Sequence, residues 1–475
     1  MKPKALLPAL FCILLFAYCA ARVTLLSMTH DESTTVLMFA SKPWGQILAN
    51  EPPSANNHIL NTLLVKLFTL GGLHKVLVRL PNLLAGALFL FFTYRMATED
   101  EKRPAWQLAG LALLAFNPYL LEFFGLARGY GLSLGFQMGS LFFARRYIRE
   151  PSSGALAWSL LLAVAGAYSN FTLLNYFVAL CLALNVMLLR NQRKERRASW
   201  LAANGQILLF SLLLLVLLYL PVKANLAAGA FYYGGQKGFF ADTFASLTEH
   251  FISNRAYLGK HTATICTWAT ALLATSAAGR HLWLWLQRRR ADSGAFFSFL
   301  LGAMALSTII QHAWLGTPYL TGRTALSFYP LMALAIWELL RATPAWAAWA
   351  LTALLTANLL ANANLVQSQD WWYDRYTESL TRYVAAQRQE GQHIRFGASW
   401  LFVPTIQYYR KAWGIGFFIG PNMDREVPTD KYFDYYYLHR DETAKLHPDY
   451  VPEKDFGEYR LMKLPPEKKE KPGEE

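Results

Sequence analysis

Apolar runs of about twenty residues recur along roughly the first three quarters of this 475-residue chain, and short polar breaks separate them. An α-helix rises 1.5 Å per residue, so roughly 20 apolar residues are needed to cross about 30 Å of lipid hydrocarbon. The chain is 54% hydrophobic and 16% charged, whereas soluble proteins carry about 25% charged residues. The sequence therefore predicts a mainly α, polytopic membrane protein with about eleven transmembrane helices, at residues 5–27, 78–97, 104–123, 129–146, 154–170, 171–189, 200–221, 262–286, 294–312, 323–341 and 344–362.

Lysine and arginine gather in alternate breaks between the predicted spans. Basic residues are enriched in the cytoplasmic loops of membrane proteins, and this bias sets the orientation of the chain. We therefore predict a multi-pass protein of the cytoplasmic (inner) membrane, with a cytoplasmic N-terminus and a C-terminus on the periplasmic or extracellular side. The net charge of +14 then reflects topology, and no nucleic-acid partner is expected. The predicted inner breaks are at residues 97–104, 145–154, 190–199, 286–293 and 339–344, and the richest clusters of lysine and arginine fall among them.

The long apolar runs end near residue 362, and residues 1–362 are predicted to form a transmembrane domain. Two of its outer breaks are much longer than the others, at residues 28–77 and 222–261. Short connections suffice to join neighbouring spans, so loops of this length are often functional. The second loop is interpreted either as a lid over a lipid-facing cavity or as a surface loop resting on lipid headgroups.

The composition becomes mixed polar and aromatic after the last predicted span. The pattern predicts a helix at about 374–390 and short strands such as 393–398. Residues 363–463 are therefore expected to form a small extracytoplasmic α/β domain. Residues 464–475 contain too few apolar side chains to pack, and they are predicted to be a disordered tail.

Two adjacent acids, Asp31 and Glu32, directly follow the first predicted span, in the stretch THDES. Ionisable residues beside a bilayer are costly, so their presence indicates a functional site. The alternative is a solvated helix start, because the positive end of the helix dipole stabilises acidic side chains. His30 precedes the two acids and is expected to tune them.

Basic residues lie at the outer ends of several predicted spans, on the same side as these acids. A guanidinium group binds phosphate through paired hydrogen bonds, so outer arginines indicate recognition of a phosphate-bearing lipid. The more common role of a lone basic residue is to extend its charged end to the lipid interface. The candidate phosphate-binding residues are Arg79, Arg128 and Arg323 at span ends, and Lys223 and Arg255 in the second outer loop.

Two more ionisable residues are candidates for contact with a substrate. His58 lies in the first outer loop, and it is interpreted as a ligand for phosphate or sugar, or as a hydrogen-bonded structural residue. Glu122 lies near the outer end of the third predicted span, where it either contacts the substrate or pairs with Arg128. The sequence contains no P-loop, no HExxH pattern and no paired CxxC pattern.

Five short pieces follow one another along about the first 340 residues. They are HDE at 30–32, NNHILNTLL at 56–64, RLPNLLAG at 79–86, LARGYGLSLGFQMGSLFFARRY at 126–147 and GRTALSFYPLMALA at 322–335. This order resembles the membrane glycosyltransferases of the C-type (GT-C) fold, specifically the family 39-like group that includes protein O-mannosyltransferases and the lipid A aminoarabinose transferase. The loop motif of that family has prolines after its histidine, whereas Ile59 and Leu60 follow His58, so this position departs from the pattern.

The resemblance implies a glycosyltransferase that acts on the outer face of the membrane. Nucleotide sugars are lacking there, so the implied donor is a hexose or pentose linked to polyprenyl phosphate. Asp31 matches the acid that serves as base in the family, and direct displacement by the acceptor hydroxyl predicts inversion at the anomeric carbon. Glu32 would orient the acceptor or bind a divalent cation, and no other cofactor is expected. The acceptor stays open among protein, lipid A, a cell-wall glycan and another membrane lipid.

A transporter or flippase of lipid-linked glycans is the alternative function. Such a protein would place ionisable residues midway through its spans and would show broken helices or an internal repeat. In this sequence the ionisable residues lie at span ends and in outer loops, which favours the enzyme. A third interpretation is a non-catalytic membrane scaffold that displays the C-terminal domain, and it assigns no special role to Asp31.

Overall fold

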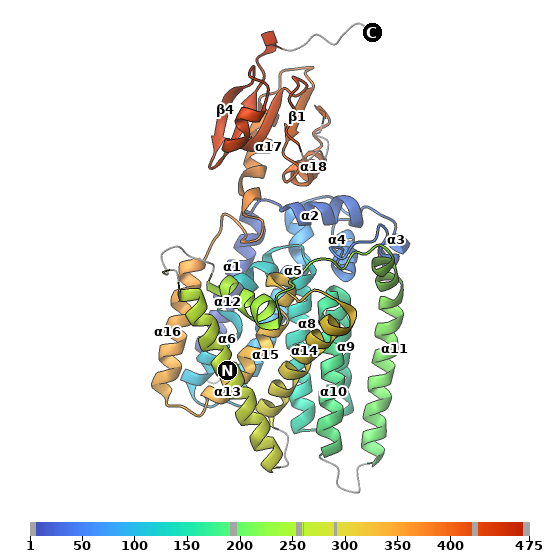
Figure 1. Cartoon of the computed structure of the whole chain (residues 1–475), viewed down its shortest axis with the longest axis vertical. Helices are drawn as coiled ribbons and strands as arrows, with labels where there is room; N and C mark the ends of the chain where they lie inside the picture. Colours follow the sequence, from blue (N-terminus) through green and yellow to red (C-terminus); the bar gives the residue numbers. More distant parts are fainter. Residues whose placement is uncertain are drawn as a thin grey trace. The chain divides into compact units, whose positions relative to one another are not determined.

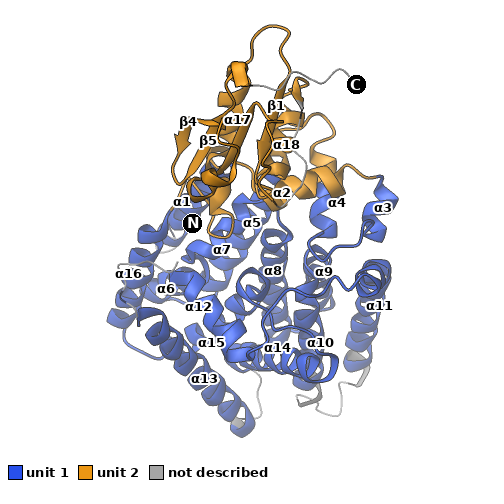
Figure 2. Cartoon of the chain, turned by 45° about the horizontal axis from the view of Figure 1, so that its top comes forward, with its two compact units in different colours: residues 1–23, 43–64, 79–363 blue, residues 24–42, 65–78, 364–475 orange. Residues whose placement is uncertain are grey.

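Figure 1 shows the computed structural model coloured along the chain. It divides into two compact units, which Figure 2 distinguishes by colour. It describes residues 6–190, 197–252, 259, 261–288, 292–419 and 426–468. Unit 1 comprises residues 1–23, 43–64 and 79–363, and unit 2 comprises residues 24–42, 65–78 and 364–475. Two segments of the first predicted outer loop therefore fold with the C-terminal part of the chain.

Helices make up 71% of the structure, which makes the protein mainly α as expected. A helix lies at each of the eleven predicted ranges. These helices are α1 (Leu6–Leu25), α5 (Lys75–Thr98), α6 (Pro104–Ala115) with α7 (Pro118–Glu122), α8 (Gly129–Arg149), α9 (Ser153–Ser169), α10 (Leu174–Arg190), α11 (Arg197–Ala227), α13 (Thr262–Arg288), α14 (Ser293–Leu315), α15 (Phe328–Leu340) and α16 (Ala345–Asn362). Shorter elements of unit 1 are α3 (Trp44–Ala49), η3 (Phe123–Gly125), η4 (Phe171–Leu173), η6 (Phe239–Phe244), α12 (Ala245–Ile252) and η7 (Gly322–Ala325). α4 (Ile59–Phe68) begins in unit 1, and its residues from Val65 on belong to unit 2.

Fewer helices than predicted are long and apolar enough to cross a membrane alone. Among the described residues, α1, α5, α11 and α14 meet both conditions, and the pair α6–α7, bent by 63°, adds a fifth if it counts as one span. The expected number of about eleven spans is therefore corrected to four or five candidates. One reason is length, because the 17 residues of α9 and the 13 of α15 extend only roughly 26 Å and 20 Å. Long apolar helices still indicate a membrane-associated protein.

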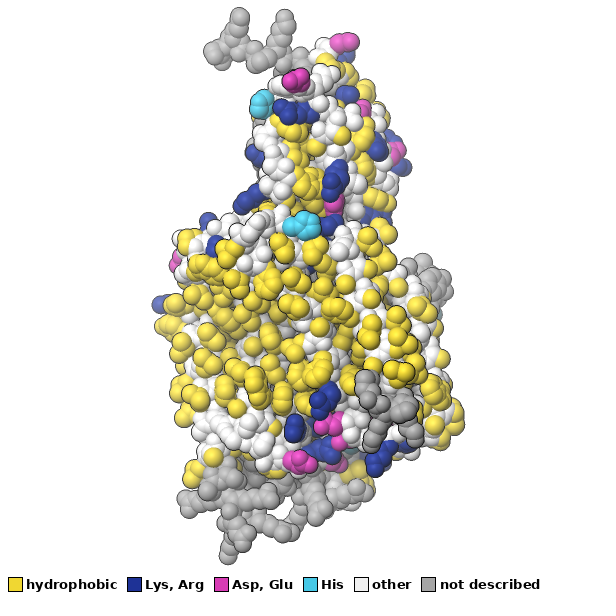
Figure 3. Space-filling view, turned by 180° about the vertical axis from the view of Figure 1, so that it is seen from behind, with side chains coloured by type: hydrophobic (Ala, Val, Ile, Leu, Met, Phe, Trp, Pro, Cys, Tyr) yellow, Lys and Arg dark blue, Asp and Glu magenta, His cyan; other side chains and the backbone are white. Residues whose placement is uncertain are grey.

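Small residues let the helices of unit 1 pack closely. α8 packs against α9, α14 against α15, and α6 against α16. A Cβ on Gly110 of α6 would lie 2.6 Å from the indole of Trp337 in α15, so glycine makes room for this buried ring. The same indole donates a hydrogen bond to the Trp106 carbonyl at 3.0 Å. Hydrophobic side chains cover much of one face of this unit (Figure 3), as expected for helices that contact lipid.

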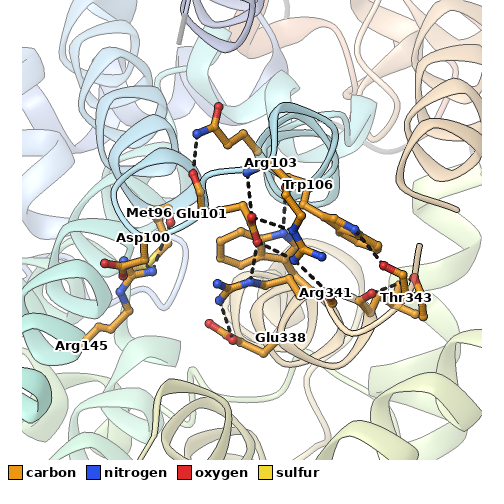
Figure 4. Close-up of polar contacts among 12 residues, drawn as sticks. Met96, Asp100, Glu101, Arg103, Trp106, Arg145, Glu338, Arg341 and Thr343 are labelled. Atoms are coloured by element: carbon orange, nitrogen blue, oxygen red, sulfur yellow. Dashed lines mark hydrogen bonds and ion pairs between the residues drawn. The ribbon is translucent and has the colours of Figure 1, made fainter. Parts of the chain in front are cut away.

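Charged side chains from three breaks meet at one end of unit 1 (Figure 4). Glu101, which is 4% exposed, pairs with Arg103 at 2.8 Å and with Arg341 at 3.0 Å. Arg341 also pairs with Glu338 at 2.9 Å. Burial raises the pKa of Glu101, but the hydrogen bonds from Arg103 and Arg341 outweigh it and lower the pKa to about 2. The charged carboxylate of Glu101 therefore links the loop before α6 to the end of α15 through its ion pair with Arg341.

Asp100 extends the same set of ion pairs to the end of α8, where it contacts Arg145 and Arg149. Arg145 also donates to the Met96 carbonyl at 3.1 Å at the end of α5. The basic breaks at 97–104, 145–154 and 339–344 thus lie together. We call Asp100, Glu101, Arg103, Arg145, Arg149, Glu338 and Arg341 the ion-pair cluster.

Unit 2 contains a five-stranded mixed sheet with the strand order β2-β1-β3-β5-β4. β1 (Ile394–Ala398) lies parallel to β2 (Phe418–Ile419) and to β3 (Tyr435–His439), whereas β5 (Tyr459–Lys463) is antiparallel to β3 and to β4 (Val451–Phe456). Gly457, with φ of 62°, allows the tight turn between β4 and β5. The predicted strand at 393–398 is therefore present as β1.

Alternate residues of the strands point to two apolar layers. Tyr435 and Tyr437 of β3 face a core that includes Leu380 of α17 (Thr377–Ala386) and Ile406 of α18 (Val403–Ala412). Tyr436 faces the other layer, with Leu438, Leu446, Tyr450, Met462 and Leu464. Leu464, 1% exposed, therefore belongs to the folded domain and not to the predicted tail. Further short elements of this unit are α2 (His30–Thr34), η2 (Thr35–Ala40), η8 (Trp372–Tyr376), η9 (Arg440–Lys445) and η10 (Pro466–Lys468).

Candidate functional site

His58 lies in a buried site at the end of α8 opposite to the ion-pair cluster. Its side chain is 6% exposed, and the ring bonds to the backbone of Ser169. Nε2 is buried and has no hydrogen-bond partner in the described structure, so Nδ1 is the nitrogen that donates to the Ser169 carbonyl. A Cβ on Gly129 would lie 2.1 Å from the Ser169 oxygen, so the first residue of α8 must be glycine. A buried nitrogen without a partner costs free energy unless a ligand satisfies it.

The guanidinium groups of Arg128 and Arg323 change the electrostatic environment of His58. Arg128 is fully buried and donates from Nη1 to the Asn56 carbonyl at 3.3 Å and from Nη2 to the Asn56 side chain. Arg323 lies over the ring of Tyr233 at 5.2 Å. Burial and the charges of Arg128 and Arg323 lower the pKa of His58 well below its ordinary value of 6.5, and the bond to Ser169 opposes this only in part. We call these three residues the arginine–histidine cluster; it carries two positive charges and a neutral imidazole.

A chain of aromatic rings extends from His58 into unit 1. Ring centroids are 4.8 Å apart for His58 and Tyr130, and 5.1 Å apart for Tyr130 and Phe123. The chain continues from Phe123 to Tyr119 at 5.2 Å and from Tyr119 to His250 at 4.5 Å. Tyr119, Phe123 and Tyr130 are buried, so these edge-to-face contacts pack the interior of unit 1 beside His58.

The described part of the loop at 222–261 is folded, and it helps to position Arg323. Gly235 and Tyr319 form an antiparallel bridge with two N–O distances of 2.9 Å. The Gly322 N–H donates to the Ser246 hydroxyl at 3.0 Å, which joins the turn before Arg323 to α12. Segments that lie roughly 80 residues apart in sequence therefore hold the Arg323 backbone.

Buried asparagine side chains hold the loop that carries His58. Asn50 donates to Asn225 of α11 at 2.8 Å and accepts from Asn57 at 2.8 Å. In the next helix pair, Asn82 of α5 donates to Asn61 of α4 at 2.7 Å and accepts a backbone N–H from the first turn of α8 at 3.1 Å. None of these asparagines is among the site residues predicted from the sequence, although four asparagines between positions 50 and 61 are a visible signal. These bonds pair most of the buried amide groups with one another, while the Asn225 amide nitrogen is buried without a partner in the described structure.

Glu122 pairs with an arginine that the sequence analysis also passed over. Its carboxylate lies 3.0 Å from Arg22 of α1, and the Arg22 side chain is fully buried. Arg128, the partner considered from the sequence, instead donates to Asn56. Arg22 was overlooked because it falls in the last turn of an apolar run, where one charge hardly changes the hydropathy.

The other predicted phosphate ligands have different environments. Arg79 is fully buried and donates to the Val23 carbonyl at 3.1 Å. Lys223 was expected in a loop but lies in α11, because the helix continues past Pro221 to Ala227. Its exposed ammonium lies 6.0 Å from the ring of Tyr219, one turn away. Arg255 lies outside the described residues.

Asp31, Glu32 and His30 belong to unit 2, whereas the arginines belong to unit 1. The acids lie in α2, which begins with a capping box: Glu32 N–H donates to Thr29 Oγ1 at 3.3 Å, and Thr29 N–H donates to Glu32 Oε2 at 3.1 Å. The buried carboxylate of Glu32 therefore has the helix-start role that was the alternative for these acids. Asp31 is half-buried.

Within the described ranges, no group of three or more His, Cys, Asp or Glu side chains comes together in a way that suits a metal ion. No protein-family model matches the chain, and no curated protein matches it. The function is therefore argued from the arginine–histidine cluster and the residue pattern.

Proposed function

We propose that this protein is an integral-membrane glycosyltransferase that moves a sugar from a polyprenyl-phosphate donor to an acceptor hydroxyl on the outer face of the cytoplasmic membrane. The observation that carries the proposal is the arginine–histidine cluster, where the charges of two arginines act on a buried imidazole inside an apolar helical unit. Guanidinium groups suit a phosphate whose lipid chain lies among apolar helices. A soluble nucleotide sugar has no such need for an apolar surrounding.

In the proposed reaction the acceptor oxygen attacks the anomeric carbon while its proton passes to a carboxylate base, the role that the family resemblance gives to Asp31. The bond from that carbon to the phosphate oxygen breaks with inversion, and the electron pair leaves with the polyprenyl phosphate. Arg128 and Arg323 stabilise the charge that develops on this leaving group. Because Nδ1 of neutral His58 carries the proton, Nε2 accepts a hydrogen bond from a sugar hydroxyl.

One observation favours the alternative, a flippase of lipid-linked glycans. The pair α6–α7 is bent by 63°, and broken helices are typical of transporters. A flippase would move the lipid-linked sugar between leaflets without breaking the bond between sugar and phosphate. Release of polyprenyl phosphate therefore separates the two functions.

The test uses purified full-length protein in liposomes with a labelled polyprenyl-phosphate sugar, a labelled nucleotide sugar and a cell-envelope fraction as acceptor. We expect polyprenyl phosphate to be released only from the lipid-linked donor. Asp31→Asn should lower the rate by about 10²- to 10⁴-fold, the usual contribution of a general base. Asp455→Asn, at an exposed ion pair of unit 2, should leave it unchanged. Turnover of the nucleotide sugar alone would reject the donor, and full activity of Asp31→Asn would reject the base.

A further inference from the structure

The segment that carries the two acids is bonded to the C-terminal part of unit 2. The backbone N–H of His30 donates to Asp374 Oδ2 at 2.6 Å. His30 Nδ1 lies 2.8 Å from the Leu401 carbonyl, and since a carbonyl only accepts, the ring is the donor. Both bonds are made by the residue directly before Asp31, although their partners lie 344 and 371 residues further along the chain.

A second attachment precedes α2 and involves the hydroxyl of Tyr409 in α18. It accepts the Met28 N–H at 2.8 Å and donates to Glu378 of α17 at 3.1 Å. Glu378 in turn pairs with Lys75 at 2.7 Å. The backbone entering α2 is therefore held to two helices of the C-terminal part.

A third attachment lies on the buried side of α2. The Ser33 hydroxyl donates to Thr405 of α18 at 3.4 Å, and Thr405 also bonds to Asp374. Asp374 and Thr405 are both fully buried. Burial raises the pKa of Asp374 well above its ordinary range, and the bonds from His30, Thr405 and Thr377 oppose this. Burying a carboxyl group costs free energy, so packing alone does not explain Asp374 at this position.

α2 needs such attachments because it cannot hold its own conformation. It has five residues, and helices this short are unstable in water on their own. A short π-helix, η2, follows it directly. The direction of the Asp31 side chain is therefore set by what α2 is bonded to.

We infer that the C-terminal α/β domain positions the acidic segment for catalysis, with Asp374 as the positioning residue that holds the backbone beside Asp31. This inference rests on the proposed function in one respect, that Asp31 is the base. It gives the C-terminal domain a role in the chemistry rather than in display of a separate binding surface. Asp374 acts through the His30 N–H and need not touch a substrate.

The test compares three variants of the full-length protein. Asp374→Ala removes the acceptor for the His30 N–H, whereas Asp374→Asn keeps an oxygen in the same place. Asp434→Ala is the matched control. Asp434 is also buried, and its carboxylate accepts the backbone N–H of Arg395 in β1 at 2.8 Å. Amide hydrogen exchange of residues 28–33 and the steady-state constants are measured for each.

We expect Asp374→Ala to speed exchange at residues 28–33 and to lower kcat by about 10- to 100-fold, with the KM for the lipid-linked donor changed less than about twofold. Asp374→Asn should restore most of kcat. Asp434→Ala should lower the unfolding temperature but leave kcat and exchange at residues 28–33 as in the natural protein. Thr405→Ser should behave like the natural protein and Thr405→Val like a weaker form of Asp374→Ala.

Two results would overturn the inference. One is unchanged exchange at residues 28–33 in Asp374→Ala, and the other is faster exchange with an unchanged kcat. If the natural protein turns over no lipid-linked sugar, the proposed function fails. The exchange data then still decide whether Asp374 holds the acidic segment.

Discussion

A single histidine explains much of the electrostatics at the candidate site. His58 is held neutral by burial and by the neighbouring charges of Arg128 and Arg323. A neutral imidazole offers one donor and one acceptor, and the donor is used by the Ser169 carbonyl. The remaining acceptor suits a hydroxyl group better than it suits an anion, which fits a sugar beside a phosphate.

The buried state of His58 predicts a pH-dependent stability. In the unfolded chain His58 takes up a proton near pH 6.5, whereas in the folded chain it does so only at much lower pH. The unfolded state therefore binds more protons below pH 6.5, and the free energy of unfolding falls as pH decreases, by at most about 1.4 kcal/mol per pH unit. Thermal unfolding of His58→Gln between pH 7.5 and about 5 should show a shallower decline. Equal slopes in the two proteins would contradict the assignment.

The proposed phosphate contact of Arg323 predicts a specific loss of donor affinity. A hydrogen bond to a charged group contributes about 1.5–3 kcal/mol, so Arg323→Ala should raise the KM for the lipid-linked donor by roughly 10- to 100-fold. Arg95→Ala is the control, since Arg95 is more than a third exposed and pairs with Glu99 one turn away. A similar rise in both variants would show a general effect of lost positive charge.

At the scale of elements, the start of α8 is the tightest point of the candidate site. A Cβ on Gly129 would lie 2.1 Å from the Ser169 oxygen and 2.6 Å from the Cβ of His58. Two backbone segments and His58 of the candidate site therefore meet where only a hydrogen atom fits. The long helix α8 thus connects this site to the ion-pair cluster at its other end.

Gly129→Ala should destabilise the protein by about 1–3 kcal/mol, since neighbouring atoms must shift to relieve the overlap. It should also raise the KM for the donor, because atoms of His58 are among those that must move. Gly205→Ala is the matched control: Gly205 lies in α11 with nothing within 4 Å of a Cβ. That change should be neutral or stabilise by about 0.5–1 kcal/mol. The free energy of unfolding of both variants is measured by denaturation in detergent. Equal changes for Gly129→Ala and Gly205→Ala would argue against the tight contact at Gly129.

The number of spanning helices shows where local patterns stop being informative. Each of the eleven apolar runs forms a helix, because helix formation depends on nearby residues and on apolar surface to bury. Whether a helix crosses lipid alone depends also on its length and on its polar residues. α15 is 13 residues long and is buried over most of its length by its neighbours. Its apolar sequence reflects protein packing as much as contact with lipid.

At the scale of the whole molecule, two different groups of polar side chains gather at the two ends of α8. Three of the breaks predicted as inner, at residues 97–104, 145–154 and 339–344, supply most of the ion-pair cluster, at the Arg149 end. The breaks predicted as outer supply Arg128, Ser169 and Arg323 around His58, at the Gly129 end. The predicted orientation of these two ends across a membrane stays a prediction.

The proposed orientation predicts a labelling pattern in intact cells. In a background without cysteines, Asp441→Cys in the exposed part of unit 2 should react with a membrane-impermeant maleimide. Glu150→Cys, exposed at the end of α8, should react only after the membrane is permeabilised. The reverse pattern would place the candidate site in the cytoplasm and remove the reason for a lipid-linked donor.

The sequence by itself determined that the chain is mainly α, with a helix at each long apolar run, and that a helix and a strand follow the last run. These features depend on residues close together in the chain, whose periodicity and charge are directly visible. Only the tertiary structure decided that the acids at 31 and 32 fold with the C-terminal domain, that Glu122 pairs with Arg22, and that His58 is neutral. Each of these depends on contacts between residues about a hundred or more positions apart, and such contacts exist only after the chain has packed.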